Sequence, residues 1–184
     1  MCGIVGITST KEVTSRIIGS LKKLEYRGYD SAGIATISEN NINEVKCEGR
    51  VNELEKNVNQ IKLSGTIGIG HVRWATHGKP STINAHPHSS DNVSVVHNGI
   101  IENSTILKKI LEKKGYKFKS QTDTEVIVHL VTDYLKKNNL KDTIIKVLKK
   151  LHGSFALGII FKDQPDLIIG ARRGSPLALS LIHI

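Results

Sequence analysis

The sequence predicts an α+β fold, with helices layered on antiparallel sheet. Predicted strands often follow one another directly, as residues 34–37 and 42–47 do, so they can pair through short turns. Three helical patterns also follow one another between residues 103 and 151 without strands between them. Strict alternation of strands and helices would instead favour a parallel sheet, so this order indicates antiparallel pairing.

The first elements are a short apolar strand at residues 4–7 and a helix. Ser9 and Glu12 have the spacing of a capping box, which predicts a helix start. Apolar residues then recur at helical spacing, at Val13, Ile17, Leu21 and Leu24. The helix ends before the loop Glu25–Gly33, which is rich in turn-forming and charged residues.

A strand pair and a second helix follow this loop. Residues 34–37 and 42–47 predict two strands joined by a turn at Asn40-Asn41. The apolar spacing over residues 51–61 predicts a helix, and residues 66–72 predict another strand.

Loops and a turn dominate the centre of the sequence. Residues 73–80 and 85–89 contain Gly or Pro next to polar residues, which predicts irregular structure. A strand at residues 93–97 is expected to stop at Asn98-Gly99, a tight-turn dipeptide.

The C-terminal part predicts three helices and two strands. Asn103 is a candidate cap for the first helix, and Thr122–Glu125 has capping-box spacing for the second. Residues 154–161 and 167–171 are almost wholly apolar, so both faces of these strands should be covered.

Composition limits the classes of function. The net charge of +9 invites a nucleic-acid interpretation, but no basic run is interleaved with aromatics, so a solvated lysine-rich surface is favoured. The two cysteines form no CxxC pair, which suits a reducing compartment. The sequence shows no signal segment and no apolar run of membrane-spanning length, so a cytoplasmic protein without membrane or specific nucleic-acid partners is expected.

Cys2 is the most informative residue. If Met1 is removed, Cys2 carries a thiol nucleophile and an α-amine whose reference pKa is about 7.7–8.0, so one residue supplies nucleophile and base. The alternative is a small buried hydrophobic side chain.

Four further residues are candidates for a site that acts on an amino-acid carboxamide. Asn98 and Gly99 offer N–H donors for an oxyanion, although Asn-Gly is also a common hairpin turn. Arg73 offers a fork for a carboxylate, and Asp123 offers a counter-charge for an ammonium or a helix cap. Trp74 is either a mobile lid or a core aromatic.

A metal or nucleotide cofactor is not expected. His71, His77, His86, His88 and His97 fall in one stretch, but no cysteine lies nearby and no zincin spacing is present. No phosphate-binding glycine motif occurs, so the prediction is that no cofactor is used.

Several segments together resemble a known family. They are Cys2–Gly6, Arg27–Gly33, Arg73–Gly78, Asn84–His88, Val96–Asn103, Thr122–Glu125 and Arg173–Leu177. In this order they resemble the glutaminase domain of glutamine:fructose-6-phosphate amidotransferases, a class II, N-terminal-nucleophile (Ntn) family.

The resemblance implies a four-layer αββα sandwich of two antiparallel sheets. It also implies that Cys2 attacks the side-chain amide of L-glutamine, that Asn98 and Gly99 form the oxyanion hole, and that glutamate and ammonia are released. Four residues would hold or enclose the glutamine together with Asp123: Arg73, Trp74, Thr76 and His77. Arg27 and Gly28 would support the Cys2 terminus.

The resemblance covers residues 2–177 as one amidotransferase domain, and residues 178–184 diverge from the family pattern. Family members continue into two isomerase domains, which bind fructose 6-phosphate and form glucosamine 6-phosphate, and the complete proteins are expected to be homodimers. The expectation is therefore a truncated chain that hydrolyses glutamine only. Two alternatives remain, an amidophosphoribosyltransferase-like domain and a non-catalytic glutamine-binding remnant.

Overall fold

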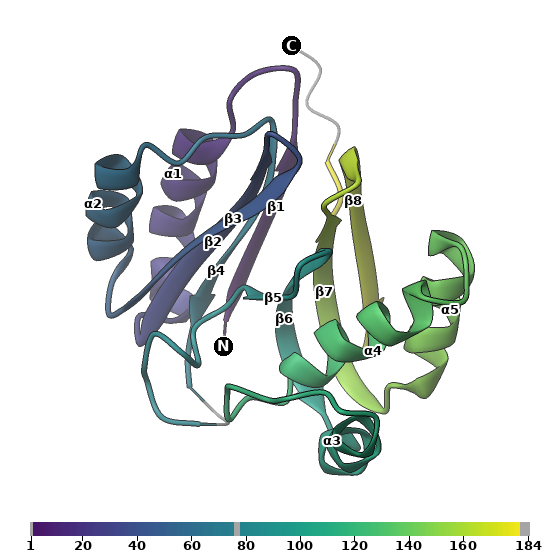
Figure 1. The fold of residues 1–184 in the computed structure, drawn as a ribbon. Coiled ribbons are helices and arrows are strands. Elements are labelled where there is room, and N and C mark those ends of the chain that lie inside the picture. Colours follow the sequence, from purple (N-terminus) through teal and green to yellow (C-terminus); the bar gives the residue numbers. More distant parts are fainter. Residues whose placement is uncertain (1, 76–77, 181–184) are drawn as a thin grey trace.

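The computed structural model describes residues 2–75 and 78–180, and it contains two four-stranded sheets (Figure 1). The first sheet has the order β1-β4-β2-β3, and all its neighbouring strands are antiparallel. Its strands are β1 (Gly3–Thr8), β2 (Ser31–Ser38), β3 (Asn41–Glu48) and β4 (Ile67–Arg73). The second sheet has the order β5-β6-β7-β8 and is also antiparallel. Its strands are β5 (His88–Ser89), β6 (Val93–Ile101), β7 (Gly153–Phe161) and β8 (Gln164–Arg173).

Helices cover the outer face of each sheet, so the layers follow the order helix, sheet, sheet, helix (Figure 1). The first sheet carries α1 (Thr14–Leu24) and α2 (Val51–Ile61), with a short 3₁₀ turn, η1 (Glu25–Arg27), after α1. The second sheet carries α3 (Ser104–Lys113), α4 (Glu125–Leu135) and α5 (Leu140–Lys150). The predicted α+β class and its four-layer arrangement are confirmed.

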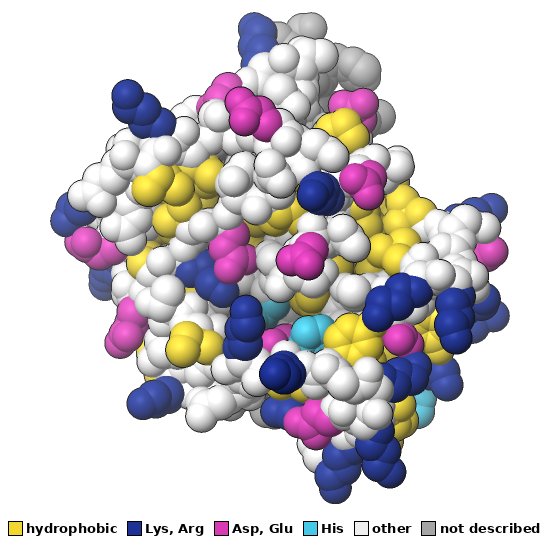
Figure 2. Space-filling view, viewed as in Figure 1, with side chains coloured by type: hydrophobic (Ala, Val, Ile, Leu, Met, Phe, Trp, Pro, Cys, Tyr) yellow, Lys and Arg dark blue, Asp and Glu magenta, His cyan; other side chains and the backbone are white. Residues whose placement is uncertain are grey.

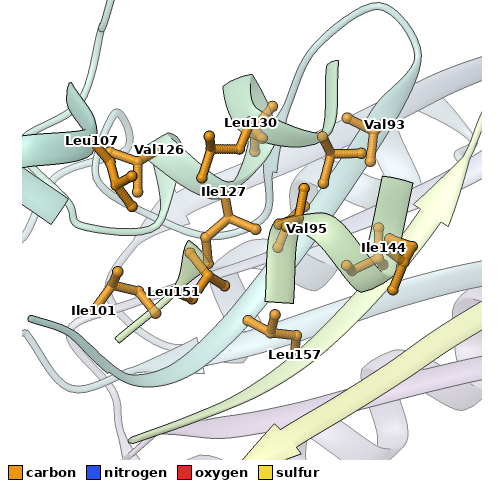
Figure 3. Packing of buried hydrophobic residues seen from close by; sticks show 14 of the residues in the cluster. Val93, Val95, Ile101, Leu107, Val126, Ile127, Leu130, Ile144, Leu151 and Leu157 are labelled. Carbon is orange, nitrogen blue, oxygen red and sulfur yellow. The ribbon is translucent and has the colours of Figure 1, made fainter. Parts of the chain in front are cut away.

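Three apolar clusters fill the spaces between these layers. The largest packs α3, α4 and α5 on the second sheet and includes Val95, Ile127 and Leu157 (Figure 3). A second cluster packs α1 and α2 on the first sheet. The third lies between the sheets and joins Ile67 and Ile69 of β4 to residues of β6 and β7. Each layer therefore buries its apolar face without leaving a separate domain.

Side chains of β4 point alternately toward α1 and toward the second sheet. Ile67 and Ile69 lie in the cluster between the sheets, whereas Val72 lies in the cluster under α1. Because side chains alternate along a strand, His71 and Arg73 continue the face of Ile67 and Ile69. The strand therefore runs from an apolar end to a polar end between the sheets.

The predicted turn at Asn98-Gly99 is wrong, because both residues lie within β6 and pair with β7. Gly99 has a φ of +125°, and a Cβ on it would lie 2.0 Å from the carbonyl oxygen of Ser154. The glycine thus permits a close approach to β7, and it does not reverse the chain. The hairpin turn of the first sheet also differs by one residue, since Glu39 and Asn40 have the positive φ values.

Neither predicted capping box forms. The α1 cap is Val13, without a side-chain hydrogen bond, and the Glu12 carboxylate accepts from the Thr14 N–H at 2.6 Å. The α4 cap is Thr124, and Glu125 instead accepts hydrogen bonds from the segment before the helix. Both pairs of residues bind nearby backbone or side-chain groups that the spacing rule does not include.

Two further expectations about the C-terminal part change. Asn103 precedes α3 as predicted, but its side chain makes no cap and binds Lys150 and His152 at the end of α5. The core covers β7, whereas most of β8 is partly or fully exposed at the edge of its sheet. Apolar composition alone therefore overestimated the burial of β8.

The surface of the helical layer on the second sheet is basic. Lys and Arg side chains gather over α3 and α5, in the lower right of the view (Figure 2). Within residues 2–75 and 78–180, no helix combines the length and the apolarity that a bilayer crossing requires.

Candidate active site

Cys2 immediately precedes β1, and neighbouring segments hold it in place. Its backbone carbonyl accepts hydrogen bonds from Arg27 Nε and from Asn98 Nδ2, each at 3.0 Å. The donors come from η1, which follows α1, and from β6 of the second sheet, so two segments far apart in the chain position the terminus. This arrangement supports the prediction that Arg27 braces Cys2.

The thiol of Cys2 contacts the peptide that follows β4. The Trp74 N–H donates to Cys2 Sγ at 3.3 Å, and Sγ lies 3.5 Å from the Trp74 carbonyl oxygen. Burial raises the pKa of the Cys2 thiol, while the Trp74 hydrogen bond and the charges of Arg73 and Arg27 oppose that rise. Burial is the largest of these contributions.

Gly28 permits this contact. A Cβ on Gly28 would lie 2.5 Å from the Arg73 carbonyl carbon and 2.7 Å from the Trp74 nitrogen. A side chain there would displace the peptide that touches Cys2 Sγ. The glycine is therefore required by close backbone approach, which fits its predicted supporting role.

Arg73 lies at the end of β4 and is 3% exposed. Its Nη2 donates to the carbonyl oxygen of Gly78 at 3.2 Å. Burial lowers the pKa of Arg73, and a thiolate at Cys2 and the carboxylates of Asp30 and Asp123 oppose that shift. The guanidinium is thus close enough to the nucleophile and to two carboxylates for their charges to interact with it.

Asp123 lies just before α4 and is also buried. Its Oδ2 accepts from the Ile101 N–H at 2.7 Å, and its Oδ1 lies 3.9 Å from His97 Nδ1. The carboxylate therefore ties the start of α4 to the end of β6 without acting as the helix cap.

Asn98 projects from β6 toward Cys2, and its amide has polar neighbours on both sides. Nδ2 donates to the Cys2 carbonyl, and Oδ1 lies 3.0 Å from His71 Nε2. Gly99 follows it on the same strand. The structure thus brings the predicted nucleophile and the predicted oxyanion donor together.

Trp74 is 44% exposed, so it is not a core aromatic. Its ring meets the Tyr29 ring edge-on, with centroids 5.6 Å apart. The Arg50 guanidinium lies over the Tyr29 ring, 5.5 Å from its centroid. Thr76 and His77, which were predicted to hold glutamine, lie outside the described residues.

Asp30 and His71 also contact residues of the site, although their sequence positions did not predict it. Asp30 accepts from the Ala75 N–H through Oδ2 at 2.8 Å, and its own N–H donates to the Arg73 carbonyl. Its position within the Arg27–Gly33 segment was the available signal. His71 was considered only as a metal ligand, and nothing in its spacing indicated a contact with Asn98.

The buried histidines form hydrogen bonds with neighbouring side chains. His86 Nε2 and His97 Nδ1 both contact Thr124 Oγ1, and His88 Nε2 contacts Thr122 Oγ1. Burial is the main cause that lowers the pKa of His71 and of His88 to about 3. Among the described residues, no group of three or more His, Cys, Asp or Glu side chains is arranged to hold a metal.

Comparisons with known proteins agree with this geometry. Residues 72–178 match the family described as "Glutamine amidotransferase domain". The chain is 54% identical over 183 residues to the glutamine–fructose-6-phosphate aminotransferase (isomerizing) of Clostridium acetobutylicum, covering 98% of this chain and 30% of that protein. The Buchnera aphidicola protein of the same name is 50% identical, with the same coverage. The chain thus spans about 30% of the length of these relatives.

Solved structures show the same fold. A glutamine phosphoribosylpyrophosphate amidotransferase from B. subtilis matches with a TM-score of 0.75 and 32% identity, covering 88% of this chain and 35% of that one. A glutamine aminotransferase class-II domain protein from Silicibacter pomeroyi matches with a TM-score of 0.64 and 14% identity, over 96% and 78% of the two chains. The chain belongs to the class II glutamine amidotransferase domain family.

Proposed function

We propose that this domain hydrolyses L-glutamine to glutamate and ammonia through a thioester on Cys2. The observation that carries the proposal is the meeting of Cys2 and Asn98, with Asn98 Nδ2 3.0 Å from the Cys2 carbonyl oxygen. Arg73 and Asp123 add buried charges of opposite sign to the same region. These charges suit the α-carboxylate and the α-ammonium of a free amino acid.

In the proposed reaction, Cys2 Sγ attacks the side-chain carbonyl carbon of glutamine. Asn98 Nδ2 and the Gly99 N–H donate to the oxygen as it gains negative charge. The thiol proton passes through the Cys2 α-amine to the leaving nitrogen when the C–N bond breaks, and ammonia leaves. Water then attacks the thioester, the C–S bond breaks, and glutamate and the thiol are regenerated.

The α-amine acts as the base only if Met1 has been removed. Met1 lies outside the described residues. Burial raises the pKa of the Cys2 thiol, so a neighbouring base such as the free α-amine would assist formation of the thiolate.

Two experiments on the purified chain test this function. The first is glutamine hydrolysis by the wild type, by Cys2→Ala and by Cys47→Ala. We expect activity in the wild type and in Cys47→Ala, and none in Cys2→Ala. The second is the mass of the chain before and after a glutamine-mimicking electrophile, with peptide mapping. Retained Met1, label on Cys47 or no label would contradict the proposal and favour a non-catalytic remnant.

In longer relatives, the proposed role of the ammonia is to convert fructose 6-phosphate to glucosamine 6-phosphate in separate isomerase domains. The name of the 54% identical relative supports this assignment. The alternative is that phosphoribosylpyrophosphate accepts the ammonia. The 32% identity to the phosphoribosylpyrophosphate amidotransferase supports this alternative less strongly. The chain alone should release ammonia without forming glucosamine 6-phosphate, and detection of that sugar from this chain would contradict the division of roles.

A further inference from the structure

His71 lies on β4, between the two sheets, directly behind the amide of Asn98. It is fully buried, and its Nε2 lies 3.0 Å from the His97 carbonyl oxygen and 3.0 Å from Asn98 Oδ1. A backbone carbonyl can only accept a hydrogen bond, so Nε2 must carry the proton. The Asn98 atom that shares this N–H must therefore be the oxygen.

The other side of the Asn98 amide leads to the same orientation. Nδ2 lies 3.0 Å from the carbonyl oxygen of Cys2, which can also only accept. A flipped amide would place NH₂ against the His71 N–H and oxygen against the Cys2 carbonyl. Both contacts would be repulsive, so two independent neighbours fix one orientation.

An amide NH₂ carries two hydrogens. In the fixed orientation one of them is directed to the Cys2 carbonyl, and the second can donate to a substrate oxygen next to Cys2. If the amide flipped, the Asn98 oxygen would face the developing negative charge and would repel it. The side chain thus helps the reaction in only one of its two orientations.

The state of the His71 ring favours the same tautomer. Burial is the main cause that lowers its pKa to about 3, so the ring is neutral at neutral pH. Its Nδ1 is buried without a hydrogen-bond partner among the described residues, and the ring stacks on His86 with centroids 4.3 Å apart. Leaving an N–H unpaired there would cost free energy, so the proton belongs on Nε2.

We propose that His71 is a positioning residue for the oxyanion hole. Its Nε2–H holds the Asn98 amide with Nδ2 toward the side-chain carbonyl oxygen of glutamine, where negative charge develops. This inference rests on the proposed glutaminase function, and it adds a residue that acts through Asn98 without touching the substrate.

Glutamine hydrolysis by two His71 variants tests the inference. His71→Leu removes the donor, and kcat should fall up to ~100-fold, within the range for loss of one oxyanion donor, while KM changes less than ~3-fold. His71→Gln retains an amide N–H near the position of Nε2, so it should recover at least ~10-fold of that loss. His88→Leu is the matched control, because His88 is also a buried histidine but contacts Thr122, and its kcat should stay within ~3-fold.

Alkylation of Cys2 by iodoacetamide separates positioning from general damage. This substitution creates no oxyanion, so the His71→Leu variant should be alkylated at Cys2 within ~3-fold of the wild-type rate. A fall in alkylation equal to the fall in kcat would show that His71 acts on the thiol, and it would overturn the inference. A folded His71→Leu variant with wild-type kcat would overturn it as well.

Nitrogen NMR of the histidine rings provides a test that needs neither activity nor a variant. The neutral Nε2–H tautomer is expected for His71 across pH 5–8. A charged ring or the Nδ1–H tautomer would overturn the inference even if the chain hydrolyses glutamine. An inactive wild type would contradict the proposed function, while the NMR result would still decide the role of His71.

Discussion

The two ends of the space between the sheets differ in chemistry, although the same strands form both. At one end, Ile67 and Ile69 of β4 pack against Val96 and Ile160 of the second sheet. At the other end, the same face of β4 presents His71 and Arg73, and β6 presents Asn98. Apolar packing at one end therefore holds the two sheets together, and this fixes the positions of the polar groups that meet at the other end.

The polar end depends on this rigid support. Burial of Arg73 and of His71 carries a desolvation cost, which hydrogen bonds and charge partners only partly offset. Such a cluster is stable only because the apolar layers fix the geometry. The comparison predicts that substitutions at the polar end change activity, whereas substitutions at the apolar end change stability.

Among variants that keep the Cys2 nucleophile, the largest effect on activity is expected at Arg73. Arg73→Ala removes a buried cation proposed to bind the α-carboxylate, so kcat/KM for glutamine should fall ~10²–10³-fold, mainly through KM. Kinetics with glutamine and with its α-carboxamide check this assignment, since the variant should lose the preference for the carboxylate. Arg172→Ala, on exposed β8, is the control. An unchanged KM in Arg73→Ala would contradict the assignment.

At the apolar end, Ile69→Ala should act on stability. Ile69 is fully buried between the sheets, so the free energy of unfolding should fall by about 2–5 kcal/mol. Urea unfolding measures this loss. The folded fraction should keep a kcat within ~3-fold of the wild type, because Ile69 packs in the apolar cluster between the sheets. A larger loss of kcat in the folded protein would show that the two ends are not separable.

Gly28→Ala should have a smaller effect on activity. The new Cβ would push the Arg73–Trp74 peptide that contacts Cys2 Sγ, so kcat/KM should fall ~10–100-fold. Gly19→Ala is the matched control, because α1 leaves open space around Gly19. That variant should be more stable by about 0.5–1 kcal/mol with unchanged activity. Equal activity in the two variants would contradict the proposal that Gly28 is needed to keep the Arg73–Trp74 peptide against Cys2.

The smallest effect concerns pH and a single histidine. Burial lowers the pKa of His88 from 6.5 to about 3, Lys46 also lowers it, and Glu125 opposes the shift. Between these two values the unfolded chain binds a proton at His88 that the folded chain does not, so stability falls as pH falls below 6.5.

The size of this pH effect can be measured by urea unfolding of the wild type and of His88→Gln between pH 7 and pH 5. Below pH 6, the slope of the unfolding free energy against pH should be smaller in the variant by about 1.4 kcal/mol per pH unit. An identical pH dependence in the two proteins would show that His88 is charged in the folded state.

Much of the fold was predictable because hydrophobic periodicity reports burial directly. The strands at 34–37, 42–47 and 66–72 and the helix at 51–61 all form close to their predicted limits. The failures have local physical causes. Asn98-Gly99 suits a turn by composition, but its positive φ serves a close contact with Ser154, which only the paired strand reveals. The capping boxes failed because Glu12 and Glu125 found other backbone donors.

The site was predictable only in part. Cys2, Asn98 and Asp123 carry chemistry that stands out in the sequence, and the structure places the Asn98 amide against the Cys2 carbonyl. His71 does not stand out, because its role depends on a contact between β4 and β6 that are far apart in the chain. Asp30 likewise acts through the Ala75 backbone, which residue type alone does not indicate.

The most direct measurement is rapid-quench mass spectrometry of the chain mixed with glutamine. We expect one γ-glutamyl group on Cys2, which forms at least as fast as glutamate accumulates and is lost on treatment with hydroxylamine. Cys2→Ala should form no adduct, and Cys47→Ala should form it normally. Glutamate release by the wild type without any adduct on Cys2 would contradict the central claim that the polar end is an acyl-transfer site.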